Sequence, residues 1–262
     1  MKKSFLICLI MVSFLVGCTS KSTDKVSSTI NFEKGFTQTL VFGTNTSASK
    51  MGFFEDKNEV QFRLDEITSD SSFVFTGKVT RMQYKSDMFG EKENVDTEIV
   101  KALNNTNKMS ATELEVYNDI KQYLDKEYTF TLDKYGTMIK SAEFKDQSLF
   151  LDASIIKGFS IVPTMSFPKE DLAVGVTWDY NTTNPLMESQ KIKFSYTVDD
   201  ITNDKIFIDV QMEMDGIGGV LSKNKAEGRY EIDRKTKRFI KGSRTMKMQT
   251  GGGKATYSIT EK

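Results

Sequence analysis

The chain has 262 residues, with 36 lysines and arginines against 36 aspartates and glutamates, and therefore no net charge. A balanced charge without a basic block disfavours a nucleic-acid partner. Because histidine is absent, the Ser-His-Asp and Cys-His nucleophile arrangements and the usual zinc sites are excluded. Only chemistry based on carboxylates, lysine or tyrosine, or on oxygen-ligated cations, remains open. We expect no catalytic residues, no metal site and no cofactor.

Residues 1–17 are predicted to form a signal peptide. Two lysines precede an apolar run over residues 5–16, which is shorter than the roughly 20 residues that a bilayer-spanning helix needs. The run ends in Leu15-Val16-Gly17-Cys18, which resembles a lipobox. In lipoproteins of this kind the cysteine thiol is diacylglycerylated, the signal peptide is cleaved, and the new amino terminus is often acylated too. Palmitate is among the expected chains, and two or three chains anchor a protein stably. An ordinary signal peptide that contains a cysteine is the alternative.

Lipidation at Cys18 predicts contact with a membrane of the cell envelope. Residue 19 is threonine rather than aspartate, which favours the outer membrane over the inner membrane if the cell is diderm. Residues 18–29 are polar, rich in Ser, Thr and Lys, and without apolar periodicity. This composition predicts a flexible tether between the anchor and the folded part.

The first half of the folded part covers about residues 30–146. Val60, Phe62 and Leu64 alternate there with polar residues ahead of an Asp-rich turn, which predicts antiparallel strands with one apolar face. An insertion over about residues 91–126 has a helical pattern.

Within this insertion, Asn94 is expected to cap a short helix. A second helix is expected after Ser110-Ala111-Thr112-Glu113, which has the capping-box pattern. A linking helix over about residues 148–160 is expected to join the two halves.

The second half covers about residues 161–262. Apolar and polar residues alternate along 191–199 and again along 206–214, on either side of Thr202-Asn203-Asp204. Because Asp and Asn are standard turn residues, we expect a tight hairpin here rather than a calcium site.

The same parts occur in the same order in both halves, which predicts an internal duplication. The corresponding segments are 35–37 and 175–177, 65–70 and 199–204, and 128–139 and 230–240. We therefore predict an α+β fold over residues 30–262. Its antiparallel sheet is strongly curved and half-barrel-like, is built from two similar halves, and is closed by the inserted helix. Two separate small sandwiches are the alternative.

Residues 167–178 read Phe-Pro-Lys-Glu-Asp-Leu-Ala-Val-Gly-Val-Thr-Trp. This element resembles the Phe-Pro…Val-x-Gly-x-x-Trp element of an uncharacterised family of bacterial lipoproteins, a domain-of-unknown-function family. Tyr196-Thr197-Val198 before an Asp turn and the stretch over 228–236 also fit, although Thr236-Lys237 stands where the family has Thr-Gly. The resemblance implies a lipoprotein without established catalytic residues. More loosely, the predicted architecture is similar to the half-barrels of lipoprotein carriers.

Candidate ligand-binding residues come from the thirteen methionines and the single tryptophan. Met212, Met214, Met246 and Met248 fall on alternating positions of the predicted strands, on the apolar side. Flexible, polarizable methionine side chains suit surfaces that bind varied apolar ligands. Trp178 is a candidate for the mouth of such a pocket. For all five residues, filling the core is the alternative.

We expect a non-enzymatic, membrane-anchored lipoprotein that binds an apolar, lipid-like ligand or an envelope partner protein. One alternative is a scaffold or protein-interaction lipoprotein with a solid core. The other is a glycoside-acting enzyme that uses two carboxylates. A hollow interior would favour ligand binding, and a packed interior with an exposed apolar patch would favour a protein partner.

Overall fold

The computed structural model describes residues 24–48, 52–103, 106, 108–146, 165–184, 187–215, 224–247 and 252–262. The predicted signal peptide, Cys18 and the predicted linking helix over 148–160 lie outside these residues. Among the described residues, no helix is both long enough and apolar enough to span a membrane.

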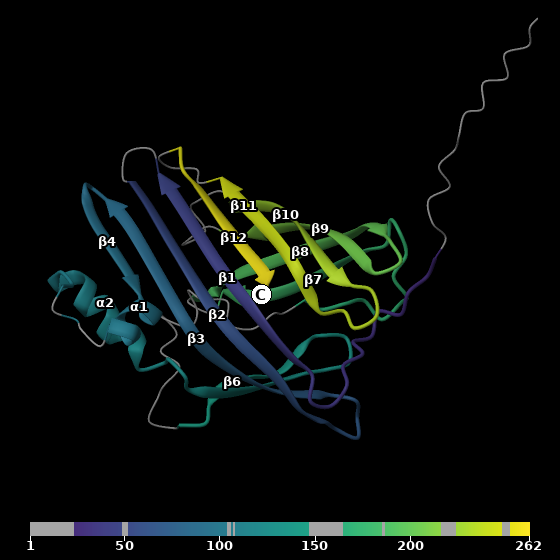
Figure 1. Ribbon diagram of the computed structural model, residues 1–262. Helices are drawn as coiled ribbons and strands as arrows, with labels where there is room; N and C mark the ends of the chain where they lie inside the picture. The colour runs from purple at the N-terminus through teal and green to yellow at the C-terminus, as the bar shows by residue number, and fades with distance from the viewer. Residues whose placement is uncertain are drawn as a thin grey trace, which may run out of the picture.

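The described strands all belong to one antiparallel sheet. They are β1 (Thr37–Ala48), β2 (Gly52–Ile67), β3 (Phe73–Met88), β4 (Glu91–Asp96), β5 (Glu127–Leu132), β6 (Met138–Phe144), β7 (Thr177–Asn184), β8 (Met187–Ile201), β9 (Lys205–Met214), β10 (Asn224–Asp233), β11 (Phe239–Lys247) and β12 (Lys254–Glu261). Their order is β6-β5-β3-β2-β1-β12-β11-β10-β9-β8-β7, and β4 pairs with β3. The sheet is open and strongly curved (Figure 1). The predicted fold class is confirmed, and the alternative of two separate sandwiches is wrong.

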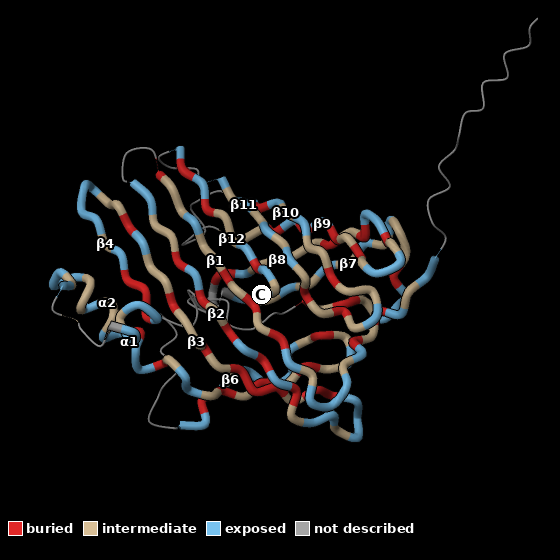
Figure 2. Tube along the Cα trace, in the orientation of Figure 1, coloured by how far each residue is buried: buried red, intermediate tan, exposed pale blue. Residues whose placement is uncertain are grey.

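Alternation of apolar and polar residues determines which face of each strand is buried. In β2, Val60, Phe62 and Leu64 are buried while the residues between them are exposed. In β9, Ile206 and Ile208 are buried in the same way. Figure 2 shows these buried positions alternating along the long strands. We call the face that carries these buried side chains the inner face.

The two halves of the sheet match in detail. Gly35 and Gly175, which precede β1 and β7, both have a positive φ, of 84° and 88°. Each donates its backbone N–H to the neighbouring strand, Gly35 to Leu64 O and Gly175 to Val198 O. Immediately after Leu64, and again after Val198, the pairing with the next strand shifts register. The fold is therefore built from two similar halves, and β12 lies between them by pairing with both β1 and β11.

The insertion in the first half is only partly helical. It contains β4, α1 (Thr97–Leu103) and α2 (Ala111–Lys121). Asn94 lies in β4, so our prediction that it caps a helix is wrong; Asp96 accepts the Glu98 N–H at 3.1 Å instead. Residues 91–96 form a strand because their backbone pairs with β3 and Val95 becomes buried.

The capping box at α2 is confirmed. The Glu113 N–H donates to Ser110 Oγ, and the Ser110 N–H donates to the Glu113 carboxylate. That carboxylate also accepts the Asn94 N–H, which attaches the start of the helix to β4. Both helices pack beside β3 and β4 at one side of the sheet (Figure 1). Our expectation that the insertion closes the half-barrel is therefore wrong, and the sheet stays open.

Two segments outside the strands lie against the rest of the domain. Val26 and Leu172 form an isolated antiparallel bridge, with N–H···O distances of 2.8 and 2.7 Å. Ser28 and Ile30 are buried, and the Ile30 N–H donates to Lys134 O. The described end of the segment that we expected to be a flexible tether, residues 24–29, is therefore attached to the domain.

Candidate ligand-binding face

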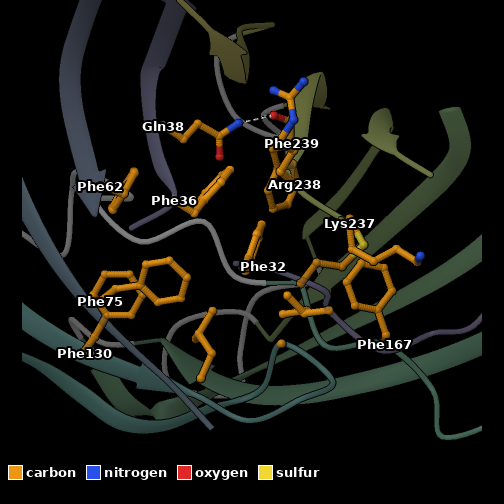
Figure 3. A pocket seen from close by; sticks show the side chains of 14 residues that line it. Phe32, Phe36, Gln38, Phe62, Phe75, Phe130, Phe167, Lys237, Arg238 and Phe239 are labelled. Atoms are coloured by element: carbon orange, nitrogen blue, oxygen red, sulfur yellow. Dashed lines mark hydrogen bonds between the residues drawn. The ribbon is translucent and has the colours of Figure 1, made fainter. Parts of the chain in front are cut away.

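A phenylalanine-rich cavity lies on the inner face of the first half, where it meets the turn before β11 (Figure 3). It is lined by Ile30, Phe32, Phe36, Gln38, Phe62, Phe75, Phe130, Leu132, Gly136, Met165, Phe167, Lys237, Arg238 and Phe239. The free space is ≈ 40 Å³, room for about three water molecules at roughly 10–15 Å³ each and too little for a lipid chain. In this conformation the cavity is therefore almost filled.

Side chains from the segment ahead of β1 do most of this filling. Phe32 stacks on Phe36 with ring centroids 4.4 Å apart, and meets the edges of Phe73 and Phe75 at 5.9 and 5.7 Å. Edge-to-face and stacked aromatic pairs of this kind contribute beyond the area that they bury. This part of the inner face is therefore a packed core.

Lys237 is a buried lysine that lines the cavity. It has a positive φ of 68°, and its Nζ donates to Arg234 O at 2.5 Å. Desolvation by burial lowers the pKa of its ammonium group to about 8; the charge of Asp233 raises this pKa in part, and the charge of Arg234 lowers it further. Across the cavity, Gln38 Nε2 donates to Phe239 O at 2.6 Å, as Figure 3 shows.

The other end of the inner face is more open. Two neighbouring rows of cross-strand partners run over it, at the end of β1 and β11 that is uppermost in Figure 1. We call these two rows the upper inner face. The first row contains Tyr84, Asp56, Thr44, Tyr257, Arg244, Gly228, Val210, Tyr196 and Trp178, and the second contains Ser86, Phe54, Thr46, Ala255, Met246, Ala226, Met212, Phe194 and Tyr180. Several of its aromatic and methionine side chains are only half-buried: Phe54, Tyr84, Tyr180, Phe194, Met246 and Tyr257.

The predicted methionines fall on this surface. Met212 is buried and Met246 is half-buried, and both pair with Ala226, which places them on the two strands that flank β10. Met214 lies one row further along the same face and is half-buried. Met248 lies outside the described residues. Their role in ligand binding stays a prediction.

Trp178 lies at the far edge of the upper inner face, on β7. Its ring stacks on Tyr196 at 5.2 Å, and its Nε1 donates to Ser166 O at 2.6 Å. A ladder of stacked rings continues from Tyr196 to Phe194 and then to Tyr180. Trp178 is therefore packed at the end of an aromatic row on β7 and β8, whereas the described candidate methionines lie on β9 and β11.

Two buried polar residues on β2 did not emerge from the sequence. Asp56 and Asn58 are 4% and 1% exposed, and Asn58 Nδ2 donates to Asp56 Oδ2 at 3.3 Å. Desolvation raises the pKa of the Asp56 carboxyl to about 7, although a hydrogen bond with Thr44 lowers it in part. Asn58 Oδ1 has no hydrogen-bond partner among the described residues. This pair makes a buried polar spot beside the apolar surface.

Arg244 was also missed, although the sequence carries its signal. It stands two residues before Met246 in an alternating strand, so the two side chains must share a face. Its guanidinium lies 5.3 Å from the Phe194 ring and 5.0 Å from the Tyr257 ring, and its Nη1 donates to Tyr230 Oη at 3.2 Å. The upper inner face therefore combines apolar side chains with one cation.

The sequence matches no protein-family model and no curated protein. The resemblance to the lipoprotein family therefore stays a prediction. Among solved structures, the fold is similar to a chain of lipovitellin, in a structure that concerns its lipid–protein interactions, with a TM-score of 0.56 and 10% sequence identity. The similarity covers 88% of this chain and 25% of the lipovitellin chain. At this identity the comparison shows one thing, that the chain shares the fold of part of lipovitellin.

Proposed function

We propose that this protein is a non-enzymatic lipoprotein of the cell envelope that holds an apolar, lipid-like ligand against its upper inner face. The observation that carries this proposal is the open, curved sheet whose half-buried aromatic and methionine side chains continue across strands of both halves. Contact with an acyl chain would remove this apolar surface from water, at about 25 cal/mol per Å². The fold shared with part of a lipid-interacting protein supports the same reading.

Ligand binding is tested by displacement of a fluorescent fatty acid from the full chain. We expect the dansyl-labelled probe to bind, oleyl alcohol to displace it, and Met246→Gln to weaken binding several-fold. The adjacent Thr245→Gln is the matched control, since Thr245 points to the opposite, exposed face. Absence of probe binding, together with absence of co-purified lipid by native mass spectrometry, would favour the scaffold with a solid core instead.

Membrane anchoring is a separate part of the proposal and rests on Leu15-Val16-Gly17-Cys18. We expect Cys18→Ser to abolish incorporation of a clickable palmitate, because the thiol that carries the acyl group is lost. The conservative control is Thr19→Ser, which leaves the cysteine in place. Equal palmitate labelling of both variants would refute lipidation at residue 18, and fractionation of inner and outer membranes tests the preference for the outer membrane.

A further inference from the structure

Five of the six arginines form ion pairs with carboxylates in the part of the chain that the structure describes. All six lie in the described part of the chain. Ion pairs with described carboxylates are formed by Arg63, Arg81, Arg229, Arg234 and Arg238. Only Arg244 has no described carboxylate within ion-pairing distance, and its one described hydrogen bond goes to the hydroxyl of Tyr230.

The setting of Arg244 makes this lack of a counter-charge more significant. Its Nε is buried and has no hydrogen-bond partner among the described residues. Phe194 lies on β8, which β10 and β9 separate from β11, so the guanidinium contacts a ring from a strand that is not adjacent to its own. Gly228, its partner on β10, has no side chain, and a Cβ at this position would lie 1.9 Å from Ser243 O and 2.7 Å from Arg244 Cβ. Glycine therefore allows β10 and β11 to pair closely beside the arginine.

A cation in such a place is usually compensated. Contacts with two aromatic rings stabilise a guanidinium, but they do not satisfy its N–H groups. Burying a polar group without a partner is unfavourable, and the planar fork of arginine matches carboxylate and phosphate groups in a bidentate manner. An anion would satisfy these N–H groups.

We propose that Arg244 binds the anionic carboxylate or phosphate head group of a single-chain amphiphile, whose hydrocarbon tail lies along the upper inner face. This inference rests on the proposed function and names its ligand class. Met246 and Phe194, in the neighbouring row, supply the apolar surface for the tail, and the Tyr257 ring lies 5.0 Å from the guanidinium. Asp56, two strands beyond Tyr257 in the same row, does not repel the anion while its carboxyl is neutral.

The test is photo-crosslinking of the full chain in phosphatidylcholine nanodiscs. The probes are diazirine analogues of oleate, oleyl phosphate and oleyl alcohol, which share a tail and differ in charge. We expect both anionic probes to label β8–β12 peptides, with yields at least tenfold lower in Arg244→Gln and partly restored in Arg244→Lys. Arg229→Gln, on the same sheet but paired with Asp199 on the exposed face, should label like the wild type. Circular dichroism melting checks that each variant is folded.

The outcomes separate the two proposals. Equal labelling of wild type and Arg244→Gln by the oleate probe would overturn the anion site, while labelling by the alcohol probe would still support apolar ligand binding. No labelling of β8–β12 by any probe would overturn both. Competition by inorganic phosphate at equal concentration would show that the site takes a free anion, and would overturn the amphiphile. The ratio of the crosslinking yields of the oleate and oleyl phosphate probes shows which head group the site prefers.

Discussion

Replacing Phe130 by alanine is expected to lower the free energy of unfolding by about 3–5 kcal/mol. Phe130 is 1% exposed. Its ring stacks on Phe75 at 5.3 Å and meets the edge of Phe62 at 5.9 Å, so removal of the ring leaves a hole between three strands. Phe130 also lines the small cavity, so the space left by its ring would join that cavity and enlarge it.

The measurement is urea unfolding followed by circular dichroism and by the fluorescence of the single tryptophan. Trp178 lies in the second half and Phe130 in the first, so equal shifts of both transitions would show that the sheet unfolds as one unit. Phe53→Ala is the control, since Phe53 is 40% exposed on β2 and should change stability by less than about 1 kcal/mol. A loss below about 1.5 kcal/mol for Phe130→Ala would contradict the packed core described here.

Replacing Asp56 by asparagine is expected to stabilise the protein at pH 8 and to change little at pH 4. The pKa of this buried carboxyl is about 7 in the folded state and 3.8 for an ordinary aspartate, so the folded state binds more protons between these pH values. The free energy of unfolding that this group contributes therefore falls as pH rises from about 4 to 7. The total loss is about 4 kcal/mol, because each unit of pKa difference corresponds to about 1.36 kcal/mol. Asparagine stays neutral throughout and removes this loss.

Urea unfolding of the wild type and Asp56→Asn at pH 4, 6 and 8 measures the effect as a difference between the two proteins. The difference is informative because several carboxylates with lowered pKa values, such as Asp96 beside Arg81, act in the opposite direction in both proteins. Asp209→Asn, at an exposed carboxylate of β9, is the control and should show no such trend. A constant difference between wild type and Asp56→Asn across the three pH values would mean that Asp56 is ionised in the folded protein.

Hairpins and buried faces were predictable because they depend on near neighbours. The alternation at Val60, Phe62 and Leu64 fixes one buried face whatever the partner strand is. The capping box at Ser110 joins groups three residues apart, and the turn at Thr202 closes on Lys205. The repeated order of parts also predicted two similar halves in one curved sheet.

Other features depend on residues far apart in the chain, and only the tertiary structure decided them. Asn94 lies in a strand rather than at a helix start because residues 91–96 pair with β3, which the local helical pattern does not indicate. Phe32 fills a cavity made by β3 and β5, which no local pattern indicates. The same applies to Asp56, whose burial depends on strands that flank β2 in the sheet.

In the candidate site, too, some features follow from local sequence and others only from tertiary structure. The sequence by itself determined that Met212, Met214 and Met246 lie on the apolar side of their strands, because side chains alternate with a period of two. Tertiary structure decided that Arg244 shares that surface without a carboxylate beside it, since the ion-pairing partners of a strand residue are set by the register of the neighbouring strands. Local periodicity fixes the face on which a side chain lies, and cross-strand pairing fixes the residues beside it.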